Sequence, residues 1–413
     1  MKVIHPQDIT LKTNAPRSKS AAHRILLAAA LCDTPTRIDL GCDSGEDVAA
    51  TLDCLAGLGA QTMRHQNFVT VTPKQGVQSD FPCRESGSTL RFFLPVAAAS
   101  GATGIFSGKG RLPERPLQEL LDALAQCGVK SSHFQLPLSL SGKLPEKSKI
   151  TLPGNVSSQY VTGFLFALAA AGGGEIILSS KLQSVDYVNL TIEILQKFGI
   201  TVETTASGFT VYGKFVSPQN IAVEGDWSNG GAYLALGAIA GRVTVGGLDP
   251  DSRQGDRRIV EILRRFGAKV TQIGQEITVE KAPLSGIGIL DIDATIDLAP
   301  VLAVVAAKAN GVTTLGNARR LRIKESDRLS AIREMLIKLG VQAVEGKDFI
   351  EIHGNGVIPG GCTLSGCGDH RIVMAATLAG LAAQRPVSLT GWEAVSKSLP
   401  DFFTRIFPAN KEL

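Results

Sequence analysis

The chain has 413 residues and a mass of 43.5 kDa, and single hydrophobic cores rarely extend beyond ~250–300 residues, so we expect two domains. Hydrophobic residues make up 44% of the sequence and charged residues 19%, which excludes an intrinsically disordered chain. The net charge of +4 is too small for a nucleic-acid coat or a polybasic membrane anchor. The composition favours a folded protein whose partners are small anions.

The cysteines and the apolar stretches indicate the environment of the protein. Seven cysteines, an odd number, include no Cys-x-x-Cys pair, so we expect neither a disulfide framework nor a zinc site. The first ten residues, MKVIHPQDIT, lack the apolar stretch of a signal peptide. The most apolar run, residues 160–178, is rich in alanine and glycine, which favours a buried helix over a membrane span. The sequence therefore predicts a reduced, cytoplasmic protein.

Five segments along the chain repeat one pattern: an amphipathic helix, a glycine, and then a β-branched strand. Their glycines, spaced 68 to 73 residues apart, are Gly59, Gly128, Gly199, Gly267 and Gly340. Glycine suits the end of a helix because it adopts the left-handed conformation without strain. The pattern predicts that each glycine ends a helix and is followed by a strand–turn–strand segment.

A second set of segments supplies the other half of the repeat. Each is an alanine-rich helix, apolar on nearly every face, followed by one strand. The third residues of these strands are Ile38, Ile105, Ile176, Val243, Thr313 and Val387. A helix that is apolar all round belongs at the centre of a domain. The unit is therefore βαβαββ, repeated six times, and the predicted fold class is α/β (α+β) with buried helices faced by sheet.

The two ends of the sequence complete this arrangement. The sixth unit is truncated after Lys397, and the opening segment has strand character with no preceding helix. We predict that the N-terminus completes the unit that the C-terminus leaves open. One domain would then be residues 17–223, and the other would be residues 1–16 with 224–413. Each domain would hold three units, and a two-strand hinge would join them.

Polar residues gather where the helices are expected to begin. The cations assigned to these helix starts are Lys19, Arg24, Arg91, Arg115, Lys324, Arg328, Arg371 and Lys397. Serine, threonine and aspartate at such positions also serve as ordinary N-caps, but the helix dipole disfavours cations there. The pattern therefore favours anionic ligands bound at helix N-termini.

Two carboxylates are candidates for proton transfer. Asp297 lies in the mostly apolar segment ATIDLAP, which would raise its pKa, and Glu325 lies between two cations in KESDR. The alternatives are a capping role for Asp297 and a capping or salt-bridge role for Glu325. As separate acid and base the two could act on one substrate. His370, in the segment GDHR, is a further candidate.

A series of motifs runs through almost the whole chain: PRSKSAAHR, SGSTLR, ERP, SSQYVTG, LRIKESDRL, GDHR and SKSLPDFF, in this order between residues 16 and 403. They resemble the 5-enolpyruvylshikimate-3-phosphate (EPSP) synthase family. The resemblance implies an inside-out α/β barrel in each of two domains that close on their ligands. It implies transfer of the enolpyruvyl group of phosphoenolpyruvate to the 5-hydroxyl of shikimate 3-phosphate, with release of phosphate, in aromatic amino-acid biosynthesis. No metal or organic cofactor is expected, and we expect a monomer.

The resemblance also implies roles for individual residues. The implied catalytic residues are Asp297 as the base at the 5-hydroxyl, Glu325 as the proton donor to the methylene carbon, Lys19 and His370. The implied shikimate 3-phosphate ligands are Lys19, Ser20, Arg24, Ser157, Ser158, Gln159, Ser184, Tyr187, Asp297 and Lys324. The implied phosphoenolpyruvate ligands are Lys19, Gly87, Arg115, Gln159, Arg328, Arg371 and Lys397.

The sequence departs from the family pattern at several positions. The usual motifs PGSKS and NAGTA read PRSKS and ESGST here, and the departures are Arg17, Glu85, Ser88, Phe92 and Arg320. Arg320 stands where many members have asparagine, so we expect one shikimate contact to be absent. The other changes are expected to alter the affinity for phosphoenolpyruvate and for glyphosate, which occupies the same subsite in the family.

Two alternative functions compete with the one that this resemblance implies. The sister family, which transfers enolpyruvyl to UDP-N-acetylglucosamine, has the same fold and a catalytic cysteine on a mobile loop. The corresponding segment here, SGKGRLPERP, contains no cysteine. The second alternative is a non-catalytic anion-binding protein, and the presence of Asp297, Glu325 and Lys19 argues against it.

Overall fold

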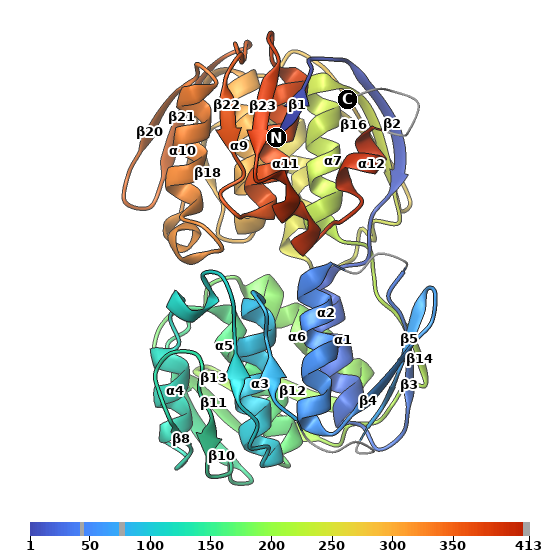
Figure 1. The fold of residues 1–413 in the computed structure, drawn as a ribbon, viewed down its shortest axis with the longest axis vertical. Helices are drawn as coiled ribbons and strands as arrows, with labels where there is room; N and C mark the ends of the chain where they lie inside the picture. Colours follow the sequence, from blue (N-terminus) through green and yellow to red (C-terminus); the bar gives the residue numbers. More distant parts are fainter. Residues whose placement is uncertain (42–44, 74–78, 408–413) are drawn as a thin grey trace. The chain divides into compact units, whose positions relative to one another are not determined.

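The structure is a computed structural model that describes residues 1–41, 45–73 and 79–407. Its contacts divide the chain into two compact units, which we call the N-unit, Arg17–Val223, and the C-unit, Met1–Pro16 with Glu224–Leu413. Each unit has its own hydrophobic core, and both contain helices and strands in alternation (Figure 1). The mixed α/β class predicted from the sequence is confirmed. That the units are lobes joined by a two-strand hinge stays a prediction.

The N-unit contains two complete βαβαββ units. Its helices are α1 (Lys19–Leu31), α2 (Glu46–Leu55), α3 (Gly87–Ser100), α4 (Gln118–Ala125), α5 (Ser158–Ala170) and α6 (Val185–Lys197). Its strands are β3 (Thr36–Asp39), β4 (Gln61–Arg64), β5 (Phe68–Thr72), β6 (Phe81–Pro82), β7 (Phe106–Ser107), β8 (Lys130–Ser131), β9 (Leu140–Ser141), β10 (Ser148–Leu152), β11 (Gly174–Leu178), β12 (Ile200–Thr204), β13 (Gly208–Gly213) and β14 (Asn220–Ala222). The two four-stranded sheets have the orders β14-β3-β5-β4 and β10-β11-β13-β12. In both, the first pair of strands is parallel and the others are antiparallel.

The second repeat of the N-unit is less regular than the sequence pattern indicates. Its strands form two separate two-stranded sheets, β6-β7 and β8-β9. An isolated antiparallel bridge between Phe106, in β7, and Leu138, just before β9, links these two small sheets. Pro82 and Pro137 lie in this repeat, and proline cannot donate a ladder hydrogen bond. The helical half of this repeat is nevertheless retained, because α3 and α4 are both present.

The C-unit repeats the same topology with strands from both ends of the chain. Its helices are α7 (Trp227–Ala240), η3 (Gly255–Arg258), α8 (Ile259–Phe266), η4 (Ile296–Leu298), α9 (Ala299–Lys308), η5 (Arg319–Ile323), α10 (Arg328–Lys338), α11 (His370–Ala382), η6 (Trp392–Lys397) and α12 (Phe402–Ile406), where η marks a 3₁₀ turn. Its strands are β1 (Lys2–Ile4), β2 (Ile9–Asn14), β15 (Gly241–Gly246), β16 (Lys269–Ile273), β17 (Glu276–Glu280), β18 (Gly288–Asp291), β19 (Asn310–Gly316), β20 (Gln342–Glu345), β21 (Ile350–Asn355), β22 (Thr363–Ser365) and β23 (Val387–Thr390). The sheet orders are β16-β17-β15-β2, β18-β19-β21-β20 and β1-β23-β22.

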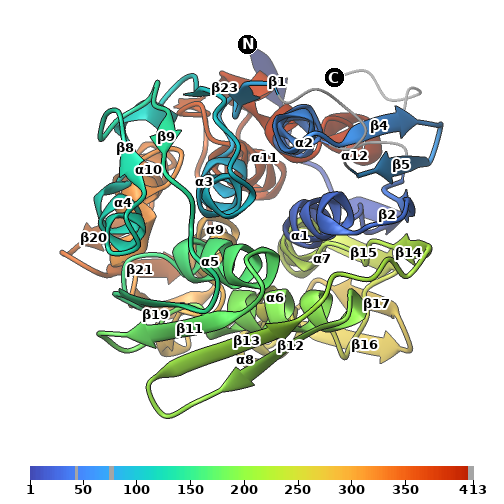
Figure 2. The same cartoon turned by 90° about the horizontal axis from the view of Figure 1, so that it is seen from below.

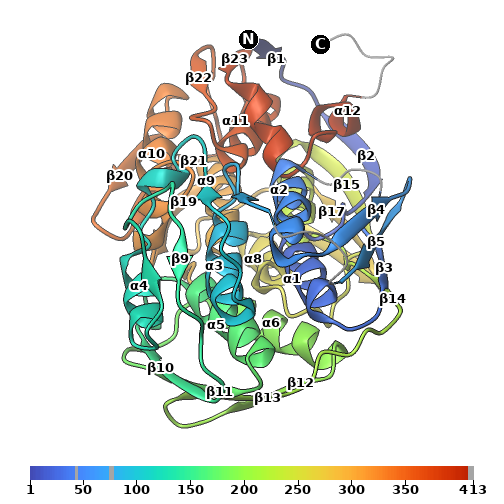
Figure 3. The same cartoon turned by 60° about the horizontal axis from the view of Figure 1, so that its bottom comes forward.

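The N-terminal strands fill open places in the C-unit. Strand β1 pairs antiparallel with β23, with Lys2 opposite Leu389, and lies beside it in Figure 3. This pairing confirms that the N-terminus completes the truncated last unit. Strand β2 pairs parallel with β15, with Ile9 opposite Gly241, and so supplies the first strand of a different repeat. The sequence analysis did not separate these two roles.

The alanine-rich helices are buried on nearly every side, as expected. Every residue of α7 is buried, and α9 and α11 pack against it and against each other. In the N-unit, α3 and α5 lie side by side (Figure 2). The glycines that end the amphipathic segments, Gly59, Gly128, Gly199, Gly267 and Gly340, all have φ between 76° and 98°. The predicted left-handed helix ends are therefore confirmed. No helix in the described part of the chain is long and apolar enough to span a membrane.

Candidate active site

Five of the six buried, alanine-rich helices begin with a side-chain cap, whereas α9, whose N-cap is Leu298, has none. In the other five a side-chain oxygen of the N-cap residue accepts a backbone N–H of the first turn; the N-caps are Ser18, Ser86, Ser157, Asp226 and Asp369. The interpretation of these residues as ordinary N-caps is thus correct. It does not account for the cations beside them.

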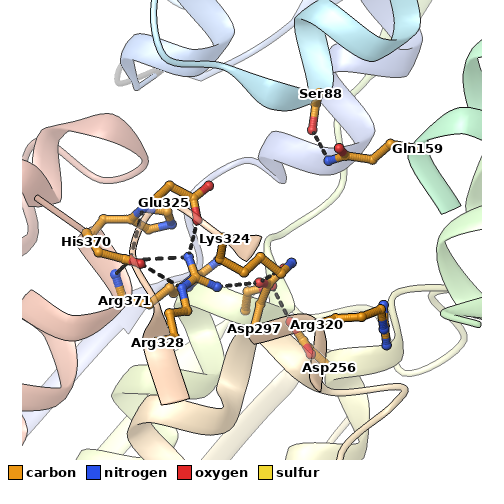
Figure 4. Close-up of polar contacts among 12 residues, drawn as sticks. Ser88, Gln159, Asp256, Asp297, Arg320, Lys324, Glu325, Arg328, His370 and Arg371 are labelled. Atoms are coloured by element: carbon orange, nitrogen blue, oxygen red, sulfur yellow. Dashed lines mark hydrogen bonds and ion pairs between the residues drawn. The ribbon is translucent and has the colours of Figure 1, made fainter. Parts of the chain in front are cut away.

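In the N-unit, two arginines lie over the first turn of α3. A β-carbon built on Gly87 would lie 2.5 Å from Nη1 of Arg115 and 3.1 Å from Nη1 of Arg91. Arg91 donates to Oε1 of Gln159 at 2.7 Å, and Gln159 in turn donates to Oγ of Ser88 at 2.9 Å (Figure 4). Guanidinium groups beside a helix N-terminus attract a small anion. Glycine at position 87 leaves the room that this arrangement requires.

The resemblance implies that phosphoenolpyruvate binds at Gly87 and Arg115. On that hypothesis we expect Gly87→Ala to weaken phosphoenolpyruvate binding by about 10- to 100-fold, because the new methyl group displaces the Arg115 guanidinium and charge-assisted hydrogen bonds contribute about 1.5–3 kcal/mol. The helix should tolerate alanine, since Gly87 is the first residue of α3 and alanine is a good helix former. Calorimetric titration with phosphoenolpyruvate measures the effect, with shikimate 3-phosphate binding as the internal control. Unchanged phosphoenolpyruvate affinity would contradict the placement of the anion at this turn.

Two other cations of the N-unit are held by polar groups from neighbouring helices. Lys19 donates to Oδ2 of Asp47 at 2.8 Å. Arg24, which is buried, donates to the carbonyl oxygen of Ser20 at 2.6 Å and to that of Tyr187 at 3.2 Å. Burial lowers the pKa of Arg24 to about 10, which leaves it charged at neutral pH. Arg24 thus contacts Ser20 on its own helix α1 and Tyr187 on α6; that these residues bind shikimate 3-phosphate stays a prediction.

The remaining predicted residues of the N-unit lie at helix ends. Ser158 is the first residue of α5 and is buried, next to Gln159. Ser184 is the N-cap of α6, is buried, and has a positive φ of 51°. A left-handed serine stores backbone strain of about 1–3 kcal/mol, which is typical of functional positions.

In the C-unit, a buried arginine joins three carboxylates. The side chain of Arg328 is 1% exposed. Its Nε donates to Asp369 at 2.8 Å, and its Nη atoms donate to Asp297 and Glu325, each at 2.7 Å (Figure 4). Burial acts to lower the pKa of Arg328, but the three carboxylates outweigh it and raise the pKa above the ordinary value. Arg328 thus holds both candidate proton-transfer carboxylates in place.

The surroundings of Asp297 differ from the expectation. The segment around it is apolar in sequence, and its neighbours Ile296 and Leu298 are buried. The Asp297 carboxylate itself accepts from Lys324 at 3.1 Å and from Arg328 at 2.7 Å. The prediction of an apolar setting was therefore wrong. Lys324, at the end of η5, and Arg328, on α10, approach the carboxylate, and the local sequence around Asp297 does not reveal them. Burial lowers the pKa of Lys324, partly offset by Asp297.

Several cations were predicted to lie at helix N-termini, but the structure places them elsewhere. Lys397 is the last residue of η6, and its Nζ donates to the carbonyl oxygen of Gly368 at 2.8 Å. Lys324 caps the end of η5 and precedes α10. Arg115 ends a 3₁₀ turn ahead of α4. The helix-start argument is corrected for these three positions, whereas Arg328 and Arg371 are in the first turns of α10 and α11.

The first turn of α11 contributes two more candidates. His370 and Arg371 are both buried. Nδ1 of His370 lies 3.9 Å from Oδ1 of Asp369, and Nη1 of Arg371 donates to Oδ1 of Asn229 on α7 at 3.0 Å. Asp369, which caps this helix, therefore faces both His370 and Arg328.

Two of the departures from the family pattern have structural partners. Arg17 donates to Asp39 at 2.5 Å and to the carbonyl oxygen of Val223 at 2.8 Å, which ties together the two ends of the N-unit. Arg320 forms an ion pair with Asp293 at 2.7 Å. The charge of Arg320 is therefore neutralised within the C-unit.

Sequence reasoning missed three groups of residues. Asp47 is the partner of Lys19, and an acidic residue in the first turn of α2 is a signal that could have suggested it.

A buried row of hydrogen-bonded side chains links α1 to the start of α3: His23 Nδ1 lies 2.6 Å from Thr51 Oγ1, and Thr51 Oγ1 lies 2.7 Å from Thr89 Oγ1. Asp256, a buried carboxylate beside Asp297, carried no sequence signal beyond its place before a helix. In the described residues, no group of three or more His, Cys, Asp or Glu side chains is arranged to hold a metal ion.

The fold places the chain among proteins with the enolpyruvyl transferase fold. The crystal structure of the enolpyruvyl transferase NikO from Streptomyces tendae superposes with a TM-score of 0.77 over 99% of this chain and 97% of that chain, at 16% identity. The family model for EPSP synthase (3-phosphoshikimate 1-carboxyvinyltransferase) matches residues 3–406. The chain belongs to this family.

Individual relatives agree with the family model. A 3-phosphoshikimate 1-carboxyvinyltransferase from Clostridium kluyveri is 37% identical, over 97% of this chain and 95% of the relative. The EPSP synthase structure from Acinetobacter baumannii superposes with a TM-score of 0.80 at 26% identity, over 98% of this chain and 96% of that chain. The resemblance read from the motifs is therefore confirmed.

Proposed function

We propose that this protein transfers the enolpyruvyl group of phosphoenolpyruvate to the 5-hydroxyl of shikimate 3-phosphate and releases phosphate. The observation that carries the proposal is the family match, which extends over residues 3–406. A role in the cytoplasm and a monomeric state, both expected from the sequence, remain predictions.

The chemistry requires an acid and a base. The methylene carbon of phosphoenolpyruvate must gain a proton while the hydroxyl attacks C2 and loses its own proton, and the tetrahedral adduct must then lose phosphate together with a proton from the new methyl group. We assign Asp297 as the base at the hydroxyl and Glu325 as the donor to the methylene carbon. Support comes from Arg328, which bonds to both carboxylates at 2.7 Å. Groups fixed in this way lose little entropy when the reacting atoms align.

Residues in each unit are assigned to substrate binding. We assign Ser157, Ser158, Gln159, Ser184 and Tyr187, with Lys19, Ser20 and Arg24, to shikimate 3-phosphate. Arg115 and the Gly87 turn, with Arg328, Arg371 and Lys397, are assigned to phosphoenolpyruvate. Lys324 would contact the shikimate ring near Asp297, and His370 would assist.

The decisive experiment offers the protein two acceptors. Incubation with phosphoenolpyruvate and shikimate 3-phosphate should release phosphate, whereas UDP-N-acetylglucosamine should not support release. Release with the nucleotide sugar alone would overturn the proposal in favour of the sister reaction. Tight binding of shikimate 3-phosphate without any release would instead identify a non-catalytic anion-binding protein.

A further inference from the structure

One buried carboxylate of the C-unit has no role in the reaction described above. Asp256 lies in the 3₁₀ turn η3 and is 2% exposed. Its Oδ2 accepts a short hydrogen bond from Oγ of Ser228 on α7. Its Oδ1 is buried and has no hydrogen-bond partner among the residues that the structure describes. A buried carboxylate with one unsatisfied oxygen is costly in free energy, so its presence calls for a functional reason.

Asp256 is surrounded by charged groups of the proposed site. Turn η3 packs against η4, which carries Asp297, and against α7. Figure 4 shows Asp256 next to Asp297. The charges that act on Asp256 are those of Asp297, Arg371 on α11 and Asp226 on α7. Helix α8, which continues η3, begins with buried apolar residues, and its first acidic residue, Glu261, is exposed.

These surroundings favour the neutral form of Asp256. Burial, and after it the charge of the nearby Asp297, raise the pKa of its carboxyl to about 7, in spite of the opposing effects of the Ser228 hydroxyl and Arg371. Two carboxylates that interact so closely titrate as a pair, because the charge of one disfavours the charge of the other. A change in the charge of Asp256 therefore changes the basicity of Asp297.

We propose that Asp256 is a positioning residue for the general base, and that its charge sets how strongly Asp297 accepts the proton of the substrate hydroxyl. This inference rests on the proposed function. When Asp256 is neutral, Asp297 is a weak base. When Asp256 ionises, its negative charge raises the affinity of Asp297 for a proton, and proton transfer from the hydroxyl becomes more favourable. Asp256 itself does not contact the reacting atoms.

The sign of the pH dependence follows from this arrangement. As the pH rises through about 7, Asp256 loses its proton and turnover should increase. Asp256→Asn fixes the neutral form, so kcat should be about 3- to 10-fold lower than that of the unaltered protein at pH 8 and nearly equal at pH 6. The ratio of the two kcat values is the quantity to measure, because protonation of the substrates cancels in it. The KM for shikimate 3-phosphate should change little.

Ser228→Ala provides an independent test that keeps the carboxylate. The hydroxyl hydrogen bond stabilises the charged form of Asp256, so its removal should move the rise in kcat to higher pH. Thr377→Val on α11 is a matched control, since this buried hydroxyl donates only to the carbonyl oxygen of Val373. Its pH profile should match that of the unaltered protein.

The outcomes distinguish failure of the inference from failure of the proposed function. A pH-independent kcat ratio for Asp256→Asn, or an unmoved profile for Ser228→Ala, would overturn the inference, and the second variant decides if the first does not fold. If the unaltered protein shows no transfer at all, the proposed function falls instead. In that case, carbon-13 NMR of protein labelled at aspartate still tests the inference. The carboxyl signal that disappears in Asp256→Asn belongs to Asp256, and it should titrate near pH 7 in the unaltered protein. A signal that stays ionised at every pH would contradict the coupling.

Discussion

Replacement of Glu325 by glutamine is expected to lower kcat by about 100- to 10,000-fold, the usual contribution of a general acid. Glutamine has nearly the same shape as glutamate and can still accept from Nη2 of Arg328, which donates to Glu325 at 2.7 Å. It has no proton to give to the methylene carbon. The affinity for shikimate 3-phosphate should therefore stay close to that of the unaltered protein. Phosphate release and calorimetric titration measure the two quantities.

A matched control is available on the helix that follows. Glu334, on α10, is exposed and forms an ion pair with Lys338 at 2.7 Å. Glu334→Gln should leave both turnover and binding unchanged. If Glu325→Gln keeps a near-normal rate, Glu325 is not the acid, and the assignment would have to move to another group such as His370.

Removal of Arg328 is expected to have the largest effect on stability. Arg328→Met leaves Asp369, Glu325 and Asp297 without their common partner, and the side chain of Asp369 is 0% exposed. Breaking a buried ion pair from one side typically costs about 3–5 kcal/mol. We expect a loss of this size in the free energy of unfolding, together with loss of activity. Urea denaturation followed by circular dichroism measures it.

Arg333→Met is the control for Arg328→Met. Arg333 lies on the same helix and is exposed, and exposed substitutions usually change stability by no more than about 0.5 kcal/mol. Equal stability losses in the two variants would show that the carboxylate network contributes nothing beyond helix propensity. A stable Arg328→Met protein with normal shikimate 3-phosphate binding but weakened phosphoenolpyruvate binding would favour a purely ligand-binding role for this arginine.

Local patterns in the sequence were sufficient to predict most of the fold. The glycines at helix ends, such as Gly59 and Gly267, could be placed because a left-handed residue after a helix depends only on its near neighbours. Burial of α7 and α11 on all sides followed from composition alone. The second repeat of the N-unit was less predictable, because the strand pattern did not show how far Pro82 and Pro137 would interrupt the sheet.

The candidate site was predictable only in part. Motif resemblance gave the residue set, and the structure brings Ser20, Arg24 and Tyr187 together within the N-unit. The partners of the charged residues could not be predicted in the same way. Asp297 lies in an apolar segment of sequence yet accepts from Lys324 and Arg328, and Asp256 lies beside it from a turn some 40 residues earlier in the chain.

By itself, the amino-acid sequence determined the repeated βαβαββ unit, the buried and amphipathic helices, and the family to which the chain belongs. These features depend on the spacing of apolar residues and on glycines, which act over a few residues. Only the tertiary structure decided which carboxylate each cation meets, because residues such as Arg328 and Asp369 are 41 positions apart. Electrostatic pairing depends on distance in space rather than along the chain, so the charge state of the site is a property of the folded molecule.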